Sequence, residues 1–346
     1  MMQTPGGNKD LRITAFGEFL LRLHSNAGKR FQQTDGYTAY YAGAEANVCV
    51  LLARLGMQAD YITRVPDNDL AAAGIQQLRS HGVNTDRILY GGDKLGLYFT
   101  EAGNSIRPTR VIYDRAGTAY AELQPGQLNW KEIFEGSHCF HWSGVAAAVS
   151  AGAADVCREA LEAAMEAGIK ISSDFNYRSK LWKYGKHPSE IMPGLLQYSE
   201  VTVADLDAVK IYFDINTDPA LTLEQRFEQC YAALQPHMPR LKTLGMSFRQ
   251  VKDQQLWYTG ALAQEGRFYY ASGFALTDIT DQIGTGDAFT AGMLYGLMNG
   301  YRPQQVIDFA TACGVIKQSI PGDWAIVSRG EVEELMNNGM SGRIAR

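Results

Sequence analysis

Short apolar segments alternate with longer helical segments along most of this chain, and this alternation limits the folds open to it. The pattern begins with an expected strand at residues 11–17 and an apolar helix at residues 44–55, which Gly56 ends. A strand at residues 59–65 and an amphipathic helix at residues 70–81 repeat it. Because parallel neighbours need helical crossovers, the alternation predicts a mostly parallel sheet covered by helices.

The same alternation resumes further along the chain. Strands are expected at residues 137–144, 169–176, 200–204, 241–248, 256–259 and 267–271, and helices at residues 153–167, 221–234, 287–299, 303–320 and 329–338. Residues 19–41 and 94–115 break the pattern with alternating polar, aromatic and β-branched side chains. We expect these two segments to form a small separate sheet that covers a site, with ordinary hairpins on the main sheet as the alternative.

The composition excludes several classes of function. A formal charge of −5 and a pI near 5.7 argue against a general nucleic-acid binder, and no basic block is present. No apolar run approaches the roughly 18 residues that span a membrane, and residues 1–10 do not resemble a signal peptide. The cysteines are scattered and odd in number: Cys49, Cys139, Cys157, Cys230 and Cys313. They indicate neither a disulfide framework nor a zinc site, so we expect a cytoplasmic location.

The segment from Asp281 to Phe289 carries the clearest chemical signal. Gly284, Thr285 and Gly286 form a flexible turn directly before an apolar helical run. Glycines let backbone N–H groups gather around an anion, and a helix start points its positive end in the same direction. Asp287 places a carboxylate where a substrate hydroxyl could lose its proton. The alternative is a plain turn with a capping aspartate.

A second polar cluster, Asp174 to Arg178, follows an expected strand. Ligand groups collect at such strand ends in parallel sheets. Arg178 could hold a phosphate or a carboxylate through two hydrogen bonds, or could be a surface arginine paired with a nearby acid. The sequence contains no Walker A loop, and no Gly-x-Gly-x-x-Gly stands between a strand and a helix, so P-loop enzymes and simple dinucleotide binders are not expected.

Two segments resemble signatures of the ribokinase/PfkB family of carbohydrate kinases. Residues 281–289 are similar to its C-terminal pattern, Asp-Thr-x-Gly-Ala-Gly-Asp-x-Phe, and residues 41–48 to its N-terminal substrate-binding segment. The resemblance implies a ribokinase-like three-layer α/β/α sandwich, with residues 1–346 as one kinase domain and residues 19–41 and 94–115 as its β lid. Further segments resemble the 2-keto-3-deoxygluconate kinase branch: residues 43–47, 96–99, 113–119, 174–178, 181–182, 320–323 and 327–329.

The resemblance implies roles for named residues, with ATP and Mg²⁺ as cofactors. Asp287 would be the general base, and the N–H groups of Gly284, Thr285, Gly286 and Asp287 would stabilise the transferred phosphoryl group. The sugar-acid pocket would comprise Gly43, Asn47, Tyr98, Tyr113, Arg115, Arg178 and Asp323, and the phosphates of ATP would meet Ser247 and Arg249. Residues 310–315 could receive adenine or form a buried helix face. Packing of the lid by the tyrosines, a polar helix-face position for Asn47 and a turn-closing role for Asp323 remain alternatives.

Departures from the family pattern affect the metal. Gln282 and Thr285 replace common Thr and Ala residues but remove no backbone donor. In the family's Asn-x-x-Glu segment this chain has Asp205 and Ala208, so Asp205 and Asp207 are weak metal candidates.

From the resemblance as a whole, we expect phosphorylation of 2-keto-3-deoxygluconate by a homo-oligomer joined through the lid. A fructokinase or other sugar kinase is the first alternative, and a catalytically weak sugar-acid or nucleotide sensor is the second.

Overall fold

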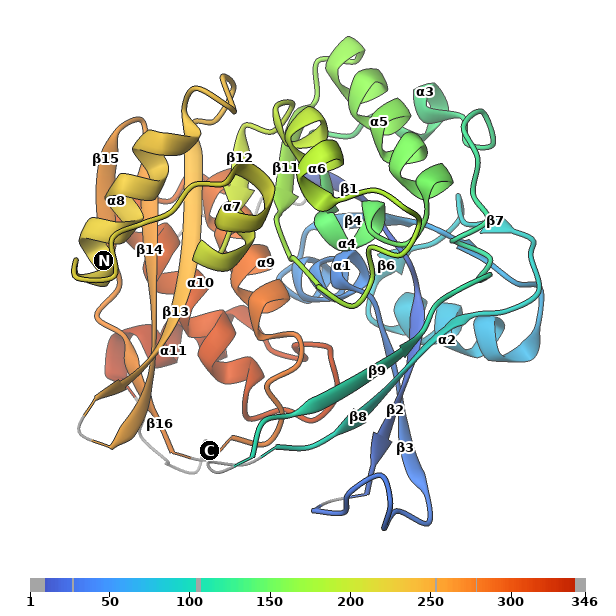
Figure 1. Ribbon diagram of the computed structural model, residues 1–346, viewed down its shortest axis with the longest axis horizontal. Coiled ribbons are helices and arrows are strands. Elements are labelled where there is room, and N and C mark those ends of the chain that lie inside the picture. The colour runs from blue at the N-terminus through green and yellow to red at the C-terminus, as the bar shows by residue number, and fades with distance from the viewer. Residues whose placement is uncertain (1–9, 27, 104–106, 253, 278, 340–346) are drawn as a thin grey trace.

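A mixed sheet forms the centre of the fold (Figure 1). The computed structural model describes residues 10–26, 28–103, 107–252, 254–277 and 279–339. The strand order is β15 (Arg267–Tyr270), β14 (Gln255–Gln264), β13 (Thr243–Lys252), β12 (Val201–Val203), β11 (Lys170–Asp174), β10 (Cys139–Ser143), β1 (Arg12–Phe16), β4 (Gln58–Ile62) and β6 (Val83–Asn84), with β16 (Phe274–Leu276) paired to β14. Pairing is parallel from β13 to β6 and antiparallel around β14.

Helices cover both faces of this sheet. One face carries α1 (Ala44–Arg54), α2 (Asp69–Ser80), α9 (Thr285–Met298), α10 (Pro303–Lys317) and α11 (Arg329–Asn338). The other carries α3 (Trp130–Ile133), α4 (Gly144–Ala147), α5 (Ala151–Glu166), α6 (Pro188–Leu196), α7 (Leu206–Phe213) and α8 (Leu223–Leu234). The predicted three-layer α/β/α sandwich is therefore confirmed.

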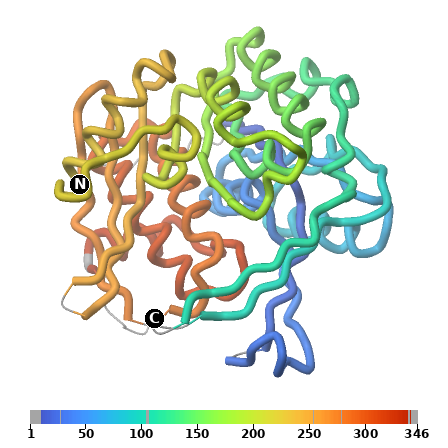
Figure 2. The backbone as a smooth tube through the Cα atoms, viewed as in Figure 1, coloured from blue at the N-terminus to red at the C-terminus, as the bar shows by residue number. Residues whose placement is uncertain are grey.

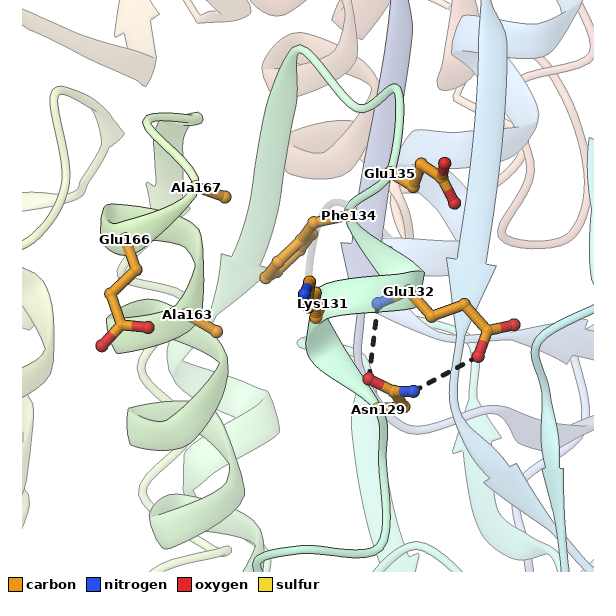
Figure 3. Close-up of a pocket in the computed structure, with 8 residues that line it drawn as sticks. All are labelled: Asn129, Lys131, Glu132, Phe134, Glu135, Ala163, Glu166 and Ala167. Atoms are coloured by element: carbon orange, nitrogen blue, oxygen red, sulfur yellow. Dashed lines mark hydrogen bonds between the residues drawn. The ribbon is translucent and has the colours of Figure 1, made fainter.

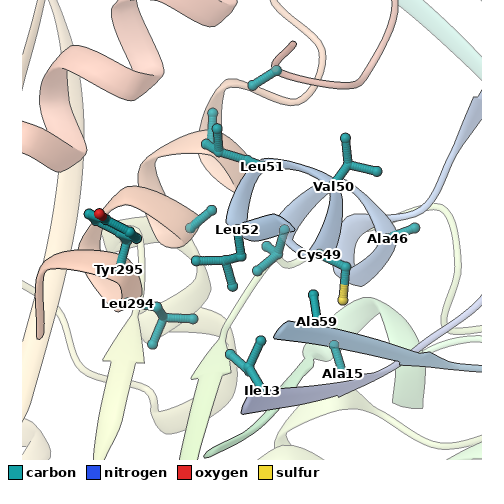
Figure 4. Packing of buried hydrophobic residues seen from close by; sticks show 14 of the residues in the cluster. Ile13, Ala15, Ala46, Cys49, Val50, Leu51, Leu52, Ala59, Leu294 and Tyr295 are labelled. Atoms are coloured by element: carbon teal, nitrogen blue, oxygen red, sulfur yellow. The ribbon is translucent and has the colours of Figure 1, made fainter. Parts of the chain in front are cut away.

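Side-chain alternation along the strands divides the buried residues into two apolar layers. Ile13 and Ala15 of β1 face the layer that contains α1 and α9, where they pack with Leu52 and Leu294 (Figure 4). Phe16 belongs to the layer on the opposite face. Because successive strand residues point to opposite faces, an apolar strand of this kind needs helices on both sides.

A second, four-stranded sheet projects from the body, as the blue and teal strands of Figures 1 and 2 show. Its order is β3 (Tyr37–Ala42), β2 (Leu20–Ser25), β8 (Gly96–Glu101) and β9 (Arg110–Asp114). The prediction of a small separate sheet is confirmed, and we call this sheet the lid. Residues 27 and 104–106 of the two predicted segments lie outside the described residues.

Several element boundaries differ from the sequence prediction. The strand expected at residues 59–65 is divided into β4 and β5 (Arg64–Val65), and β5 pairs with β7 (Leu89–Tyr90). The strands expected at residues 241–248 and 256–259 are the long antiparallel pair β13 and β14. Helix α9 begins at Thr285, two residues earlier than expected. Helices α3, α4, α6 and α7 were not predicted, because they are short or, in α6, contain Pro193.

Candidate active site

A pocket of about 570 Å³ lies between the lid and the carboxyl ends of the central strands. Strands β1 and β10 are neighbours from which the chain proceeds in opposite directions across the sheet, and ligands bind at such switch points. All the predicted catalytic, substrate and nucleotide residues line this one pocket: Gly43, Asn47, Tyr98, Tyr113, Arg115, Arg178, Ser247, Arg249, Gly284, Thr285, Gly286, Asp287 and Asp323. The fold thus brings residues from distant segments of the chain into one site.

Asp287 lies in the first turn of α9 and receives a hydrogen bond from α1. The Asn47 amide Nδ2 donates to Oδ2 of Asp287 at 2.6 Å, while the buried Oδ1 of Asn47 has no protein partner among the described residues. Burial raises the pKa of the Asp287 carboxyl to about 6, although the Asn47 hydrogen bond and the Arg178 charge act in the opposite direction. Asn47 is therefore more than a polar residue on a helix face.

The glycine turn leaves the start of α9 open to the pocket. Gly284 is the N-cap, with φ of 82° and ψ of 0°, and no side chain caps the helix. The first N–H groups of a helix have no intrahelical partner, so those of Gly286 and Asp287 are available to an anion. A Cβ added at Gly286 would meet nothing within 4 Å, so the turn is open at this position. The turn thus fits a phosphate group.

The two predicted pocket arginines have different surroundings. Arg115 is buried and forms an ion pair with buried Glu18, which also accepts a hydrogen bond from Thr118. Arg178 is exposed, has no ion pair among the described residues, and donates to the carbonyl of Tyr177 at 3.0 Å. From the sequence, both arginines were expected to line the sugar-acid pocket. Of these two arginines, Arg178 has no ion pair among the described residues, whereas Arg115 is already neutralised by Glu18.

Asp323 is held firmly at the other end of the pocket. The Tyr98 hydroxyl donates to its Oδ1, and Arg22 Nη1 lies 3.0 Å from its Oδ2. The rings of Tyr98 and Tyr113 are 6.2 Å apart, and the Arg115 guanidinium lies over the Tyr113 ring. The tyrosines therefore pack within the lid and line the pocket at the same time, and Asp323 does more than close a turn.

The region expected to contact the nucleotide lies along β13. Ser247 and Arg249 line the pocket, and Arg249 Nη1 donates to the side-chain oxygen of Gln282 at 3.1 Å. The replacement at Gln282 thus connects Arg249 to the glycine turn. Residues 310–315 do not line the pocket; Gly314 packs against the Tyr258 hydroxyl instead. This packing supports the buried helix face rather than an adenine wall.

The weak metal candidates differ in position. Asp205 lines the pocket, and its Oδ1 caps α7 by accepting from the N–H of Ala208 at 2.8 Å. Asp207 is exposed on the first turn of α7 and does not line the pocket. No group of three or more His, Cys, Asp or Glu side chains that could hold a metal occurs among the described residues. The pocket therefore fits only an ion held largely by substrate oxygens and water, as is usual for Mg²⁺.

Sequence reasoning missed two carboxylates at the site. Asp174 lines the pocket, and burial raises its pKa to about 7, with the Asp287 charge acting in the same direction. The signal for Asp174 was its place at the end of β11 in the cluster that also supplied Arg178. Glu18 had no comparable signal, because its partner Arg115 lies 97 residues away.

Another hollow lies on the surface between α3 and α5 (Figure 3). Its glutamates point away from Phe134, and Asn129 accepts from the N–H of Glu132 and donates to the side chain of the same residue. Lys131 is accompanied by three glutamates, so no group of polar atoms converges on a ligand position. We therefore place the candidate site in the pocket beneath the lid.

Comparisons with known proteins agree with this geometry. A model for "pfkB family carbohydrate kinase" matches residues 10–209 and 256–323. The chain is 31% identical to the 2-dehydro-3-deoxygalactonokinase of Haloferax volcanii, over 95% of this chain and 98% of that protein. The 2-dehydro-3-deoxygluconokinase structure from Thermotoga maritima superposes with a TM-score of 0.89 at 31% identity, over 95% of this chain and 98% of the other. A PfkB family kinase of Listeria grayi gives 0.86 at 28% identity, over 94% and 100%.

The fold, the pocket and these matches define the protein as a carbohydrate kinase. Kinases of this class use ATP as the phosphoryl donor. The chain belongs to the pfkB family of carbohydrate kinases. Among the described residues, no helix combines the length and hydrophobicity that crossing a bilayer requires.

Proposed function

We propose that this kinase transfers the γ-phosphoryl group of ATP to the terminal hydroxyl of 2-keto-3-deoxygluconate, giving 2-keto-3-deoxy-6-phosphogluconate. The observation that carries the proposal is the placement of Asp287 beside an uncapped helix start, in a pocket that also contains the unpaired Arg178. The names of the Thermotoga and Haloferax relatives support a keto-deoxy sugar acid as substrate.

Asp287 would act as the general base. Its pKa of about 6 leaves the carboxylate ionised near neutral pH and still basic enough to accept a proton. As the substrate oxygen forms its bond to the γ-phosphorus, its proton passes to Asp287. The bond between the γ-phosphorus and the bridging oxygen breaks, and ADP leaves with the electron pair. The Asn47 amide fixes the carboxylate oxygen Oδ2 during this transfer.

The N–H groups of Gly286 and Asp287 would stabilise the charge that develops on the transferred phosphoryl group. Backbone donors at a helix start are preorganised, so they need no rearrangement when the reaction occurs. Ser247 and Arg249 would contact the other phosphates from the β13 side of the pocket. When bound, Mg²⁺ would neutralise phosphate charge, and the carboxylates available to it or to its water ligands are Asp174 and Asp205.

Arg178 would bind the carboxylate of the sugar acid. A guanidinium without an acidic partner can form paired hydrogen bonds with a carboxylate. The free Oδ1 of Asn47 and the lid tyrosines offer partners for the substrate hydroxyls. A neutral sugar such as fructose has no carboxylate to accept paired hydrogen bonds from Arg178, so this arrangement favours an acid over the fructokinase alternative.

The outer face of the lid supports the proposed homo-oligomer. Residues that alternate with the pocket-facing ones place Leu23, Leu97, Phe99 and Ile112 on that face, and Ile112 is 53% exposed. The Tyr37 ring, 43% exposed, meets the Phe99 ring edge-on at the same face, with the ring centroids 5.9 Å apart. Apolar sheet faces of this kind are commonly covered by a second copy of the chain. Size measurement by light scattering, repeated with Ile112→Lys, tests this part of the proposal.

An ADP-release assay tests the function. The panel is 2-keto-3-deoxygluconate, its galactonate epimer, fructose, ribose and gluconate, each with ATP and Mg²⁺. We expect turnover on the keto-deoxy acids, and Asp287→Asn should lower kcat by about 100- to 10,000-fold while still binding ATP. Turnover only on fructose or ribose would contradict the substrate, and an unimpaired Asp287→Asn enzyme would contradict the mechanism.

A further inference from the structure

A buried arginine connects the lid to the loop that precedes the glycine turn. Arg22 belongs to lid strand β2 and is 1% exposed. Its Nη1 lies 2.8 Å from Oδ2 of Asp281 and 3.0 Å from Oδ2 of Asp323, and its Nε donates to the Thr100 hydroxyl at 2.8 Å. Neither Arg22 nor Asp281 lines the pocket. Neither residue therefore has a direct role in the proposed phosphoryl transfer.

Asp281 connects the two loops on either side of the helix start. Its Oδ1 accepts from the N–H of Ile283 at 3.1 Å, one residue before the turn, and its Oδ2 accepts from the N–H of Gly322 at 3.1 Å. Its carbonyl accepts from the buried Lys317 ammonium at 3.3 Å. A single carboxylate thus joins the lid, the turn loop and the loop that contains Asp323.

The packing around Gly284 leaves little freedom between these loops. A Cβ added to Gly284 would lie 2.1 Å from the carbonyl oxygen of Asp323. A displacement of the Asp323 loop would therefore move the turn, and with it the N–H groups of Gly286 and Asp287. Because a misplacement of about 1 Å in a reacting group can cost on the order of 100-fold in rate, a shift at this contact would slow phosphoryl transfer.

We propose that Arg22 is a positioning residue for phosphoryl transfer, which acts through Asp281 to hold the glycine turn in register with the lid and with Asp323. This inference rests on the proposed function for its kinetic effect. The guanidinium also neutralises Asp281 and Asp323, so the two carboxylates do not repel the incoming phosphate. One set of hydrogen bonds and ion pairs thereby fixes both the substrate side of the pocket and the anion hole, by which we mean the N–H groups of Gly286 and Asp287.

The kinetic test compares Arg22→Gln, Asp281→Asn and the double variant. Each single variant should lower kcat by about 100-fold with little change in the KM for ATP. The double variant should be no less active than the more impaired of the two single variants, because all three changes break the same interaction. Arg22→Lys keeps the positive charge but lacks the planar guanidinium, so it should recover part of kcat. Lys29→Gln, which breaks the exposed 2.6 Å pair with Asp35 on the lid, is the matched control.

Two results would overturn the inference. In the first, both single variants match Lys29→Gln in kcat per folded molecule, so that only thermal stability changes. In the second, the two losses multiply, which would mean that Arg22 and Asp281 act independently. A wild-type enzyme inactive on the keto-deoxy acids would instead overturn the proposed function.

Hydrogen exchange tests the positioning without any substrate. We expect Arg22→Gln to increase amide exchange in residues 281–287 and 320–323 together, relative to Lys29→Gln. Unchanged exchange in both segments would overturn the inference even where kcat falls.

Discussion

The Asn47 amide, at the start of α1, donates to the Asp287 carboxylate, at the start of α9, across 2.6 Å. The two residues are 240 positions apart and come from the two signature segments of the chain. The bond places a neutral donor on the proposed base, where it stabilises the ionised form without removing its basicity. Substrate-binding and phosphate-binding halves of the pocket therefore meet at this bond.

Replacing Asn47 by Leu should shift the acidic limb of the pH profile. The hydrogen bond lowers the pKa of Asp287 against the opposing effect of burial, so its loss raises that pKa above about 6. Since the base must be ionised, kcat/KM rises with pH through this pKa, and the limb moves to higher pH. The ratio of wild-type to variant kcat/KM should thus be larger at pH 6 than at pH 8.

The control for Asn47 is Asn84→Leu. The Asn84 amide also donates to a carboxylate, that of Asp60 at 3.1 Å, but neither residue lines the pocket. Its profile should match that of the wild type. An acidic limb that stays in place in Asn47→Leu would show that Asp287 is not the titrating base.

The two glycines of the turn should respond differently to alanine. Gly284 has φ of 82°, and its new Cβ would collide with the carbonyl of Asp323, so Gly284→Ala should lose several kcal/mol of stability. The Cβ at Gly286 meets nothing within 4 Å, so Gly286→Ala should keep its Tm but place a methyl group where the phosphate approaches. Calorimetry and kcat measured together separate the two effects. Full activity in Gly286→Ala would contradict the proposed anion hole.

The fold was largely predictable because it depends on local patterns. The alternation of apolar strands and amphipathic helices predicted the sandwich, and the two segments without that alternation predicted the lid. Helices such as α4 were missed because four residues show no periodicity, and the end of β13, residues 249–252, is too polar to suggest a strand.

The site was predictable only where a motif carried it. The resemblance in two segments located Asp287 and Asn47, which the fold then brought together. The partners of Arg115 and Arg22 could not be predicted, because Glu18 lies 97 and Asp281 lies 259 residues away from them. Ion pairs of this range leave no local pattern in a sequence. The ion pair that neutralises Arg115 was missed for that reason.

Arg178 and Arg115 should therefore give opposite phenotypes when changed to Gln. Loss of the unpaired Arg178 should raise the KM for a keto-deoxy acid by about 10- to 100-fold at nearly constant stability, because a charged hydrogen bond to the ligand is lost. Arg115→Gln leaves Glu18 buried without its counter-ion and should cost about 3 kcal/mol of stability. Denaturation curves and KM values for both variants check this. A larger increase in KM for Arg115→Gln than for Arg178→Gln, measured on folded protein, would indicate that Arg115 binds the substrate carboxylate.

Glu45 gives a prediction about stability rather than catalysis. It is 1% exposed, its Oε1 has no hydrogen-bond partner among the described residues, and burial raises its pKa to about 7. Because this folded-state pKa exceeds the ordinary value of 4.5, the folded protein binds the proton more tightly than the unfolded chain does. The stability that Glu45 contributes is present below about pH 4.5 and is lost as the pH rises through about 7.

Glu45→Gln is neutral at every pH and should escape this loss. Its stability relative to the wild type should rise by about 2 kcal/mol between pH 5 and pH 8, measured by urea denaturation at both values. The control is Glu331→Gln, because hydrogen bonds from Ser328 lower the pKa of Glu331. Between pH 5 and pH 8 the Glu331 carboxylate is largely ionised in both the folded and the unfolded protein, so this change should alter the stability by nearly the same amount at the two values. A pH-independent difference between Glu45→Gln and the wild type would mean that the carboxylate is solvated or paired in the folded protein.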